Sequence, residues 1–106
     1  LIAVAELLAD EQDRLAADGF TARMGGEEFL MVLPGVTAAE AFERLDAVRR
    51  LIAGHRWQPV TGELPVTISV GAVATGLANR DRAQLLAEAD RRLYTAKREG
   101  RNRVVS

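Results

Sequence analysis

Residues 20–33 read FTARMGGEEFLMVL, and this stretch indicates how the chain around it is arranged. A strand-like run from Phe20 to Met24 leads into Gly25-Gly26, a pair that readily supplies the positive φ angles of a hairpin turn. A second strand is predicted from Glu27 to Leu33, and both of its faces become apolar after the charged tip. Such a strand is covered on both sides. The stretch therefore predicts a β-hairpin whose second strand is buried between other elements.

An amphipathic helix is predicted before the hairpin, from Leu1 to about Ala17, and Asp18-Gly19 ends it. One stripe of this helix carries Ile2, Ala5, Leu8, Gln12 and Leu15. The acidic cluster Asp10-Glu11-Asp13 is interpreted as a solvated helix face. Because no capping side chain precedes this helix, we expect the chain to begin within an element.

A second helix is predicted after Pro34-Gly35, which ends the hairpin. Thr37 and Glu40 have the spacing of a capping box, so the helix is expected to start there and to end at Gly54. Its predicted buried stripe consists of Ala41, Phe42, Leu45, Val48 and Ile52. Residues 55–64 are predicted to form a loop.

The last third of the chain predicts a strand, a helix and a short strand. Residues 66–74 are rich in β-branched side chains, and Gly71 among them suggests the close approach of another group. A helix follows the cap signal at residues 81–84 and ends near Gly100, with a face of Leu86, Ala89, Leu93 and Ala96 or Lys97. Tyr94 is expected to pack under this helix, and residues 103–106 form a final strand. The order indicates a single α+β domain.

Composition restricts the classes of function. The 106 residues are 48% hydrophobic and 27% charged, as in a soluble globular domain, and the formal net charge is -1. Such a chain has no overall field to attract nucleic acid or an anionic membrane, so we expect no nucleic-acid partner. It contains no cysteine, which excludes disulfides and thiolate metal sites. An anionic ligand would have to be held by a local cluster.

The first candidate cluster is the hairpin tip, where two adjacent carboxylates follow two glycines. Glycine lets a ligand approach the backbone, and Mg²⁺ is commonly bound by one or two carboxylates together with substrate phosphates. Glu27 and Glu28 therefore fit a metal-nucleotide site. The alternative interpretation is that Glu27 and Glu28 only form a charged, solvated hairpin tip without a ligand.

The second candidate cluster is cationic. Lys97 lies in the last turn of the predicted helix, and Arg101 follows four residues later, so both could converge on a polyphosphate. The alternative is that Lys97, Arg98 and Arg101 only complement the negative end of the helix dipole.

Three segments of the chain resemble the GGDEF family in order and spacing. They are Arg23–Phe29 (Arg-x-Gly-Gly-Glu-Glu-Phe), Val66–Gly71 (Val-Thr-Ile-Ser-Val-Gly), and Ala89–Asn102, which contains Leu-Tyr-Thr-Ala-Lys and Gly-Arg-Asn. The resemblance runs essentially from Leu1 to Ser106, so residues 1–106 are expected to be one partial GGDEF domain.

This resemblance implies a nucleotidyl-cyclase-like, ferredoxin-like fold with a mostly antiparallel sheet flanked by helices. It also implies a bacterial diguanylate cyclase, in which a homodimer of two antiparallel domains condenses two GTP molecules into cyclic di-GMP and releases pyrophosphate. By the same resemblance Glu27 would bind the metal ion, Mg²⁺ or Mn²⁺, and Glu28 would be a catalytic carboxylate near the metal and the reacting hydroxyl. The positions that match the family's substrate-binding residues are Gly25, Gly26, Lys97 and Arg101.

The family's first strand and helix would precede Leu1. In the family that strand is central in the sheet and carries a second metal-binding aspartate, and the segment after it recognises guanine. Either a parent protein supplies both, or a partner chain does, or the module is not catalytic; we expect the first, with a sensor or regulatory domain in the same parent protein. The expected location is the cytoplasm, including the cytoplasmic part of a membrane-bound sensor.

The family's product-inhibition site has the pattern Arg-x-x-Asp just upstream of the hairpin. Ala16 and Gly19 occupy the matching positions. Feedback inhibition by product binding at this site is therefore expected to be absent.

Three classes of function fit these residues. A diguanylate cyclase accounts for the retained Glu27-Glu28 pair, because a degenerate domain would be freer to lose it. A catalytically inactive GGDEF-type regulatory module, which binds GTP or a protein partner, accounts for the missing first strand. A ferredoxin-like interaction domain explains the alternation of helices and strands, but not the joint occurrence of the carboxylates with Lys97 and Arg101.

Overall fold

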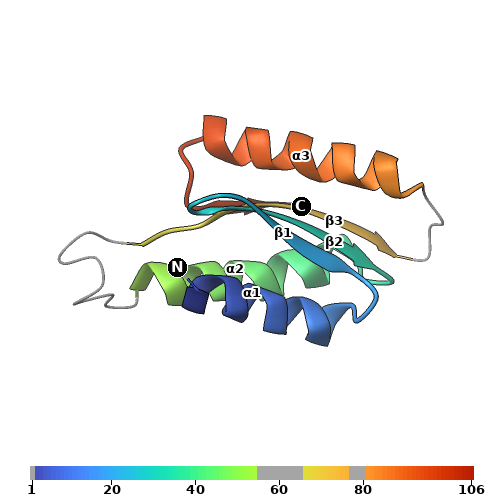
Figure 1. The fold of residues 1–106 in the computed structure, drawn as a ribbon, viewed down its shortest axis with the longest axis horizontal. Coiled ribbons are helices and arrows are strands. Elements are labelled where there is room, and N and C mark those ends of the chain that lie inside the picture. Colours follow the sequence, from blue (N-terminus) through green and yellow to red (C-terminus); the bar gives the residue numbers. More distant parts are fainter. Residues whose placement is uncertain (1, 55–65, 77–80) are drawn as a thin grey trace.

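The computed structural model describes residues 2–54, 66–76 and 81–106, which form helices packed on a sheet (Figure 1). In chain order the elements are α1 (Ile2–Leu15), β1 (Phe20–Gly25), β2 (Glu28–Pro34), α2 (Ala38–Gly54), β3 (Ser69–Gly76), α3 (Arg82–Arg98) and β4 (Arg103–Val105). This order confirms the predicted succession of elements. The predicted loop at residues 55–64 lies outside the described residues.

The sheet has the strand order β1-β2-β3-β4. The pair β1–β2 is antiparallel, whereas β2–β3 and β3–β4 are parallel. The α+β class is confirmed, and the described sheet is mixed rather than mostly antiparallel. The reason is connectivity: a hairpin joins β1 to β2, but a chain that crosses over through a helix, as in α2 and α3, returns in the same direction.

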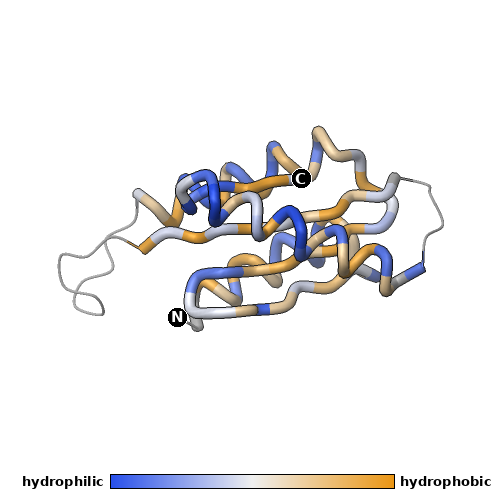
Figure 2. The backbone as a smooth tube through the Cα atoms, turned by 90° about the horizontal axis from the view of Figure 1, so that it is seen from above, coloured by the Kyte–Doolittle hydropathy of each residue, from blue (hydrophilic) through white to orange (hydrophobic). Residues whose placement is uncertain are grey.

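Two helical layers cover the sheet, with α1 and α2 on one face and α3 on the other (Figure 1). β2 contributes Phe29, Met31 and Leu33 to the first layer and Leu30 and Val32 to the second. All five are buried, which confirms the predicted strand with two apolar faces. Figure 2 shows hydrophobic and hydrophilic segments alternating along the chain, as expected for elements that bury one face and expose the other.

The helix starts follow the predicted caps. The Thr37 hydroxyl accepts a hydrogen bond from the Glu40 amide at 3.2 Å, at the start of α2. Asp81 is the N-cap of α3, and its carboxylate accepts from the Ala83 amide at 3.3 Å. These local bonds satisfy amides that the first turn of a helix leaves unpaired.

Several side chains differ from their predicted burial, most of them because the helices are rotated differently about their axes. Phe42 is 44% exposed and Tyr94 is 59% exposed, since each lies one residue, or about 100°, from the buried stripe. On α3 that stripe contains Leu85 rather than Leu86. Glu11, predicted to be solvated, is buried because Arg44 of α2 pairs with its carboxylate at 2.9 Å.

Gly71 lies where α3 crosses β3. A β-carbon at this position would overlap the carbonyl oxygen of Ala89 and the amide nitrogen of Leu93, and would lie 2.8 Å from the Leu93 α-carbon. The predicted close approach at Gly71 is thus confirmed, and the approaching group is helix backbone. Within the described chain, no helix combines the length and the apolar composition needed to cross a membrane.

Gly71→Ala is expected to lower the free energy of unfolding by about 1–3 kcal/mol, because the added methyl group forces α3 away from the sheet. Urea unfolding followed by circular dichroism measures this change. Gly26→Ala is the matched control, since a β-carbon there meets nothing within 4 Å. Equal stability of the Gly71→Ala and Gly26→Ala proteins would contradict this account of the packing.

Candidate functional site

The hairpin tip is held by an arginine of its own first strand. The Arg23 guanidinium donates to the carbonyl oxygen of Gly25 at 3.1 Å and to that of Gly26 at 2.8 and 3.2 Å. The strand register shifts between Arg23 and Gly25, where the tip begins. Arg23 thus shapes the tip, although the sequence motif alone gave this residue no role.

Neither tip glycine has a positive φ, so the prediction that Gly25-Gly26 supplies positive φ angles was wrong. The register shift and the clamp by Arg23 turn the chain without them. The glycines instead leave space: a β-carbon on Gly26 meets nothing within 4 Å, and one on Gly25 would come 3.0 Å from the Glu28 carboxylate. Gly26 therefore opens to the outside of the tip.

Glu28 joins the hairpin to the end of α3. Its carboxylate pairs with Lys97 Nζ at 3.4 Å and with Arg101 Nη1 at 2.9 Å. The hydrogen bond from Arg101 is the main cause that lowers the pKa of Glu28, with Lys97 adding to it and desolvation opposing it. The structure thus brings together three of the predicted site residues: Lys97 and Arg101 follow Glu28 by 69 and 73 positions in the sequence, Lys97 within α3 and Arg101 just after it.

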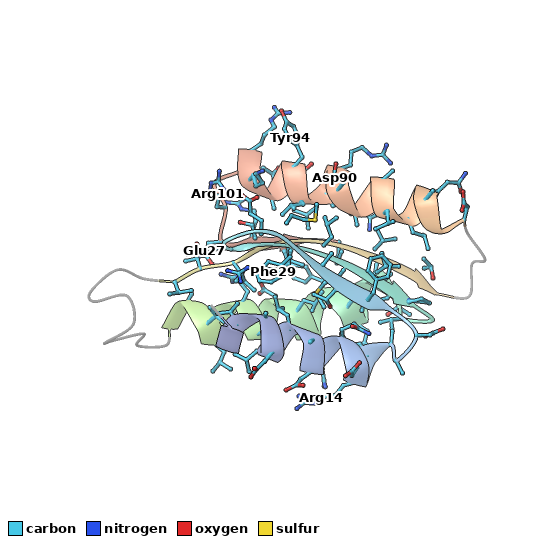
Figure 3. All side chains as sticks on the ribbon, viewed as in Figure 1. Arg14, Glu27, Phe29, Asp90, Tyr94 and Arg101 are labelled. Carbon is cyan, nitrogen blue, oxygen red and sulfur yellow. The ribbon has the colours of Figure 1, made fainter. Side chains whose placement is uncertain are left out.

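Arg101 is presented by a Schellman motif at the end of α3. The Gly100 amide donates to the Lys97 carbonyl at 3.4 Å, and the Arg101 amide donates to the Ala96 carbonyl at 2.9 Å. Gly100 has φ 116°, which suits glycine. The motif turns the chain back toward the hairpin, so Arg101 lies at the same end of the molecule as Glu27 (Figure 3).

Glu27 occupies the turn itself and is exposed. Its backbone carbonyl accepts from the Ser69 amide at 2.9 Å, which ties the tip to β3. Within the described residues its carboxylate has no hydrogen-bond or ion-pair partner, in contrast to that of Glu28. The described part of the chain also contains no group of three or more metal-ligating side chains. Glu27 and Glu28 alone could offer carboxylates to a metal ion here, and Mg²⁺ commonly takes one or two together with phosphate oxygens.

The two positions that match the product-inhibition pattern lie between α1 and β1. Ala16 is buried, and a β-carbon on Gly19 would overlap the carbonyl oxygen of Val32. Position 19 therefore has no room for a carboxylate side chain in this backbone conformation.

Comparison with known proteins identifies the family. The family model described as "Diguanylate cyclase, GGDEF domain" matches residues 1–103. The response regulator PleD of Caulobacter vibrioides is 38% identical over 85 residues, which cover 78% of this chain and 19% of PleD. The probable diguanylate cyclase DgcF of Escherichia coli is 37% identical over 94 residues, which cover 81% of this chain and 29% of DgcF.

The diguanylate cyclase DosC of Escherichia coli is 31% identical over 93 residues, which cover 87% of this chain and 20% of DosC. The chain thus spans less than a third of the length of each of these relatives. The match to the family model includes the hairpin, the β3 region and α3, which are the segments that form the site described above. The chain belongs to the GGDEF family.

Proposed function

We propose that residues 1–106 are the carboxy-terminal part of a diguanylate cyclase domain that condenses two GTP molecules into cyclic di-GMP. The observation that carries the proposal is the convergence of Lys97 and Arg101 on Glu28, beside a glycine-opened hairpin tip. Two cations paired with one carboxylate leave one positive charge uncompensated. A triphosphate is a suitable partner for this charge, because phosphate oxygens accept from guanidinium and ammonium groups.

In this proposal Lys97 and Arg101 bind the phosphates of GTP, and the open side of Gly26 lets the nucleotide approach the backbone. Phosphate oxygens then compete with the Glu28 carboxylate for the same two cations. Release from these ion pairs frees the Glu28 carboxylate for other partners in the site. The site residues therefore bind and orient the nucleotide, which is the main protein contribution in phosphoryl-transfer reactions.

Glu27 suits a metal ligand in this arrangement, since its carboxylate is exposed and has no partner among the described residues. The donor set of Glu27, the adjacent Glu28 and substrate phosphates fits Mg²⁺ or Mn²⁺. When bound, such an ion neutralises charge that develops on the phosphates during transfer.

The reaction requires two copies of the domain. Each 3′-hydroxyl oxygen forms a bond to the α-phosphorus of the other GTP, and the bond from that phosphorus to the β-phosphate oxygen breaks, so each GTP releases one pyrophosphate. One Lys97–Arg101 pair serves one triphosphate, so we propose an antiparallel homodimer. A cytoplasmic location follows from the use of GTP, and a sensor or regulatory domain in the parent protein fits PleD being named a response regulator.

The second candidate function is a catalytically inactive module that binds GTP or a protein partner. One observation favours it: β2 pairs directly with β3, and the Ser69 amide donates to the Glu27 carbonyl, so the backbone of the hairpin tip is already engaged in the sheet. Turnover by the intact protein that carries residues 1–106 distinguishes the two candidates.

Glu27→Gln is expected to reduce cyclic di-GMP formation by about a hundredfold or more, since it removes a charge that acts on the reacting phosphates. The intact protein is assayed with GTP and Mg²⁺, and the product is quantified by chromatography. Glu43→Gln, on the exposed side of α2, is the control and is expected to retain activity. GTP binding without product in the unmodified protein would favour the inactive module instead.

Arg101→Gln is expected to raise the pKa of Glu28, because Arg101 is the main cause of its lowering. Ion pairs of a carboxylate with a lowered pKa stabilise the fold above its ordinary pKa, and this stability is lost as the pH falls through the lowered value. The carboxyl ¹³C shift of Glu28 is followed against pH without metal or nucleotide. Arg98→Gln is the control, since Arg98 instead lies over the Tyr94 ring, 5.8 Å from its centroid. An unchanged Glu28 pKa in Arg101→Gln would contradict the described geometry.

Product inhibition through the segment before the hairpin is expected to be absent, because positions 16 and 19 offer neither a cation nor a carboxylate. Isothermal titration of the 106-residue chain with cyclic di-GMP is expected to show no tight binding. Titration of the same sample with GTP is the control for a competent protein. Tight binding of cyclic di-GMP would reverse this expectation.

A further inference from the structure

The turn after α3 has an unusual backbone. Gly100, Arg101 and Asn102 follow one another with φ of 116°, 63° and 46°, so two non-glycine residues adopt left-handed conformations in succession. Such conformations are unfavourable for side chains other than asparagine and aspartate, and they persist where surrounding contacts hold them. The contacts that hold this turn therefore also determine where Arg101 points.

One of these contacts comes from α2, which lies on the face of the sheet opposite to α3 (Figure 1). Arg49 Nη1 donates to Asn102 Oδ1 at 3.1 Å, with the Asn102 carbonyl oxygen at 3.5 Å. These residues are 53 positions apart in the chain. Arg49 thus binds both the side chain and the backbone of the last left-handed residue.

Arg49 is itself held in place by Asp46. Its Nε lies 2.6 Å from Asp46 Oδ1, and the two side chains are only 17% and 12% exposed. The hydrogen bond from Arg49 is the main cause that lowers the pKa of Asp46. Arg50 pairs with the other oxygen of Asp46 at 3.0 Å, but it is 74% exposed, and among the described residues it makes no hydrogen bond with Asn102.

We propose that Arg49 is a positioning residue: fixed by Asp46, it holds Asn102 and thereby the left-handed turn that directs Arg101 to Glu28 and to the phosphates of a bound nucleotide. The role toward the phosphates of a nucleotide rests on the proposed function. The contact also links α2 to the phosphate-binding end of α3 across the edge of the sheet. Among the described residues, Asp46 and Arg49 make no hydrogen bond or ion pair with Glu28 or Lys97, so their effect passes through the turn.

The first test compares Arg49→Gln with Arg50→Gln in the 106-residue chain. Both variants remove one ion pair of Asp46, but only Arg49→Gln removes the contact with Asn102. A positive φ produces a strong intraresidue amide–Hα NOE, which ¹⁵N-edited NMR measures for Arg101 and Asn102. We expect these NOEs to weaken in Arg49→Gln and to persist in Arg50→Gln. This test needs no nucleotide, so it stands even if the proposed function fails.

The second test measures binding of inorganic triphosphate by titration calorimetry. Arg49→Gln is expected to weaken binding by about fivefold or more, within the range of coupling between contacting residues. In an Arg101→Gln background the same change is expected to have no further effect, because Arg49 acts through Arg101. Arg50→Gln is expected to bind like the unmodified chain.

Asn102→Gly provides a variant that keeps the backbone conformation accessible while it removes the side chain that Arg49 holds. It is expected to weaken triphosphate binding as Arg49→Gln does, and the two changes together should not add. The proposal would be overturned if the NOEs of Arg101 and Asn102 were unchanged in Arg49→Gln. It would also be overturned if the NOE intensity fell equally in Arg49→Gln and Arg50→Gln. Absence of triphosphate binding in every protein, with the NOE difference intact, would instead count against the proposed function alone.

Discussion

The burial of β2 on both faces is the constraint on which the rest of the structure depends. Its side chains alternate between the α1–α2 layer and the α3 layer, so neither helical layer can shift without disturbing the other. Gly71 brings α3 onto the neighbouring strand at backbone contact distance. Because β2 is fixed from both sides, the position of Glu28, its first residue, is also fixed at the end of the sheet. The charged tip is thus positioned by the apolar core behind it.

The charge cluster at that end is preorganised by opposite charge. Lys97 and Arg101 would repel each other if left alone, and Glu28 offsets this repulsion while holding both at 3.4 and 2.9 Å. A ligand that replaces the carboxylate meets cations that already converge, so less ordering is required on binding. The core therefore fixes the position of Glu28, and the Glu28 carboxylate holds Lys97 and Arg101 close together. The Schellman turn determines the direction of Arg101.

Local patterns in the sequence were sufficient to predict the elements, the caps at Thr37 and Asp81, and the close approach at Gly71. Burial of single helical side chains was less predictable. Neighbouring positions on a helix point about 100° apart, so Phe42 and Tyr94, each next to a buried position, are exposed. Contacts between distant segments could not be predicted at all. The pairing of Glu11 with Arg44 spans 33 positions, and that of Arg49 with Asn102 spans 53. Glu28, Lys97 and Arg101 could be singled out together because a family motif contains them, whereas the contacts that support them carry no local signal.

The two halves of the proposed site depend on the sheet in different ways. Glu27 is tied to β3 by its carbonyl bond with Ser69, at the start of the parallel β2–β3 pairing. β2 and β3 run parallel to each other. A strand inserted between them could pair antiparallel with both, so their directions are also compatible with the family's central first strand. Entry of a strand between β2 and β3 would break the Glu27–Ser69 bond. The ion pairs of Glu28 instead join β2 to the end of α3 through side chains, and they do not require β2 and β3 to be paired. In the proposed function, phosphate binding therefore rests on the side-chain cluster of Glu28, Lys97 and Arg101, whereas metal binding at Glu27 depends on which strand pairs with β2.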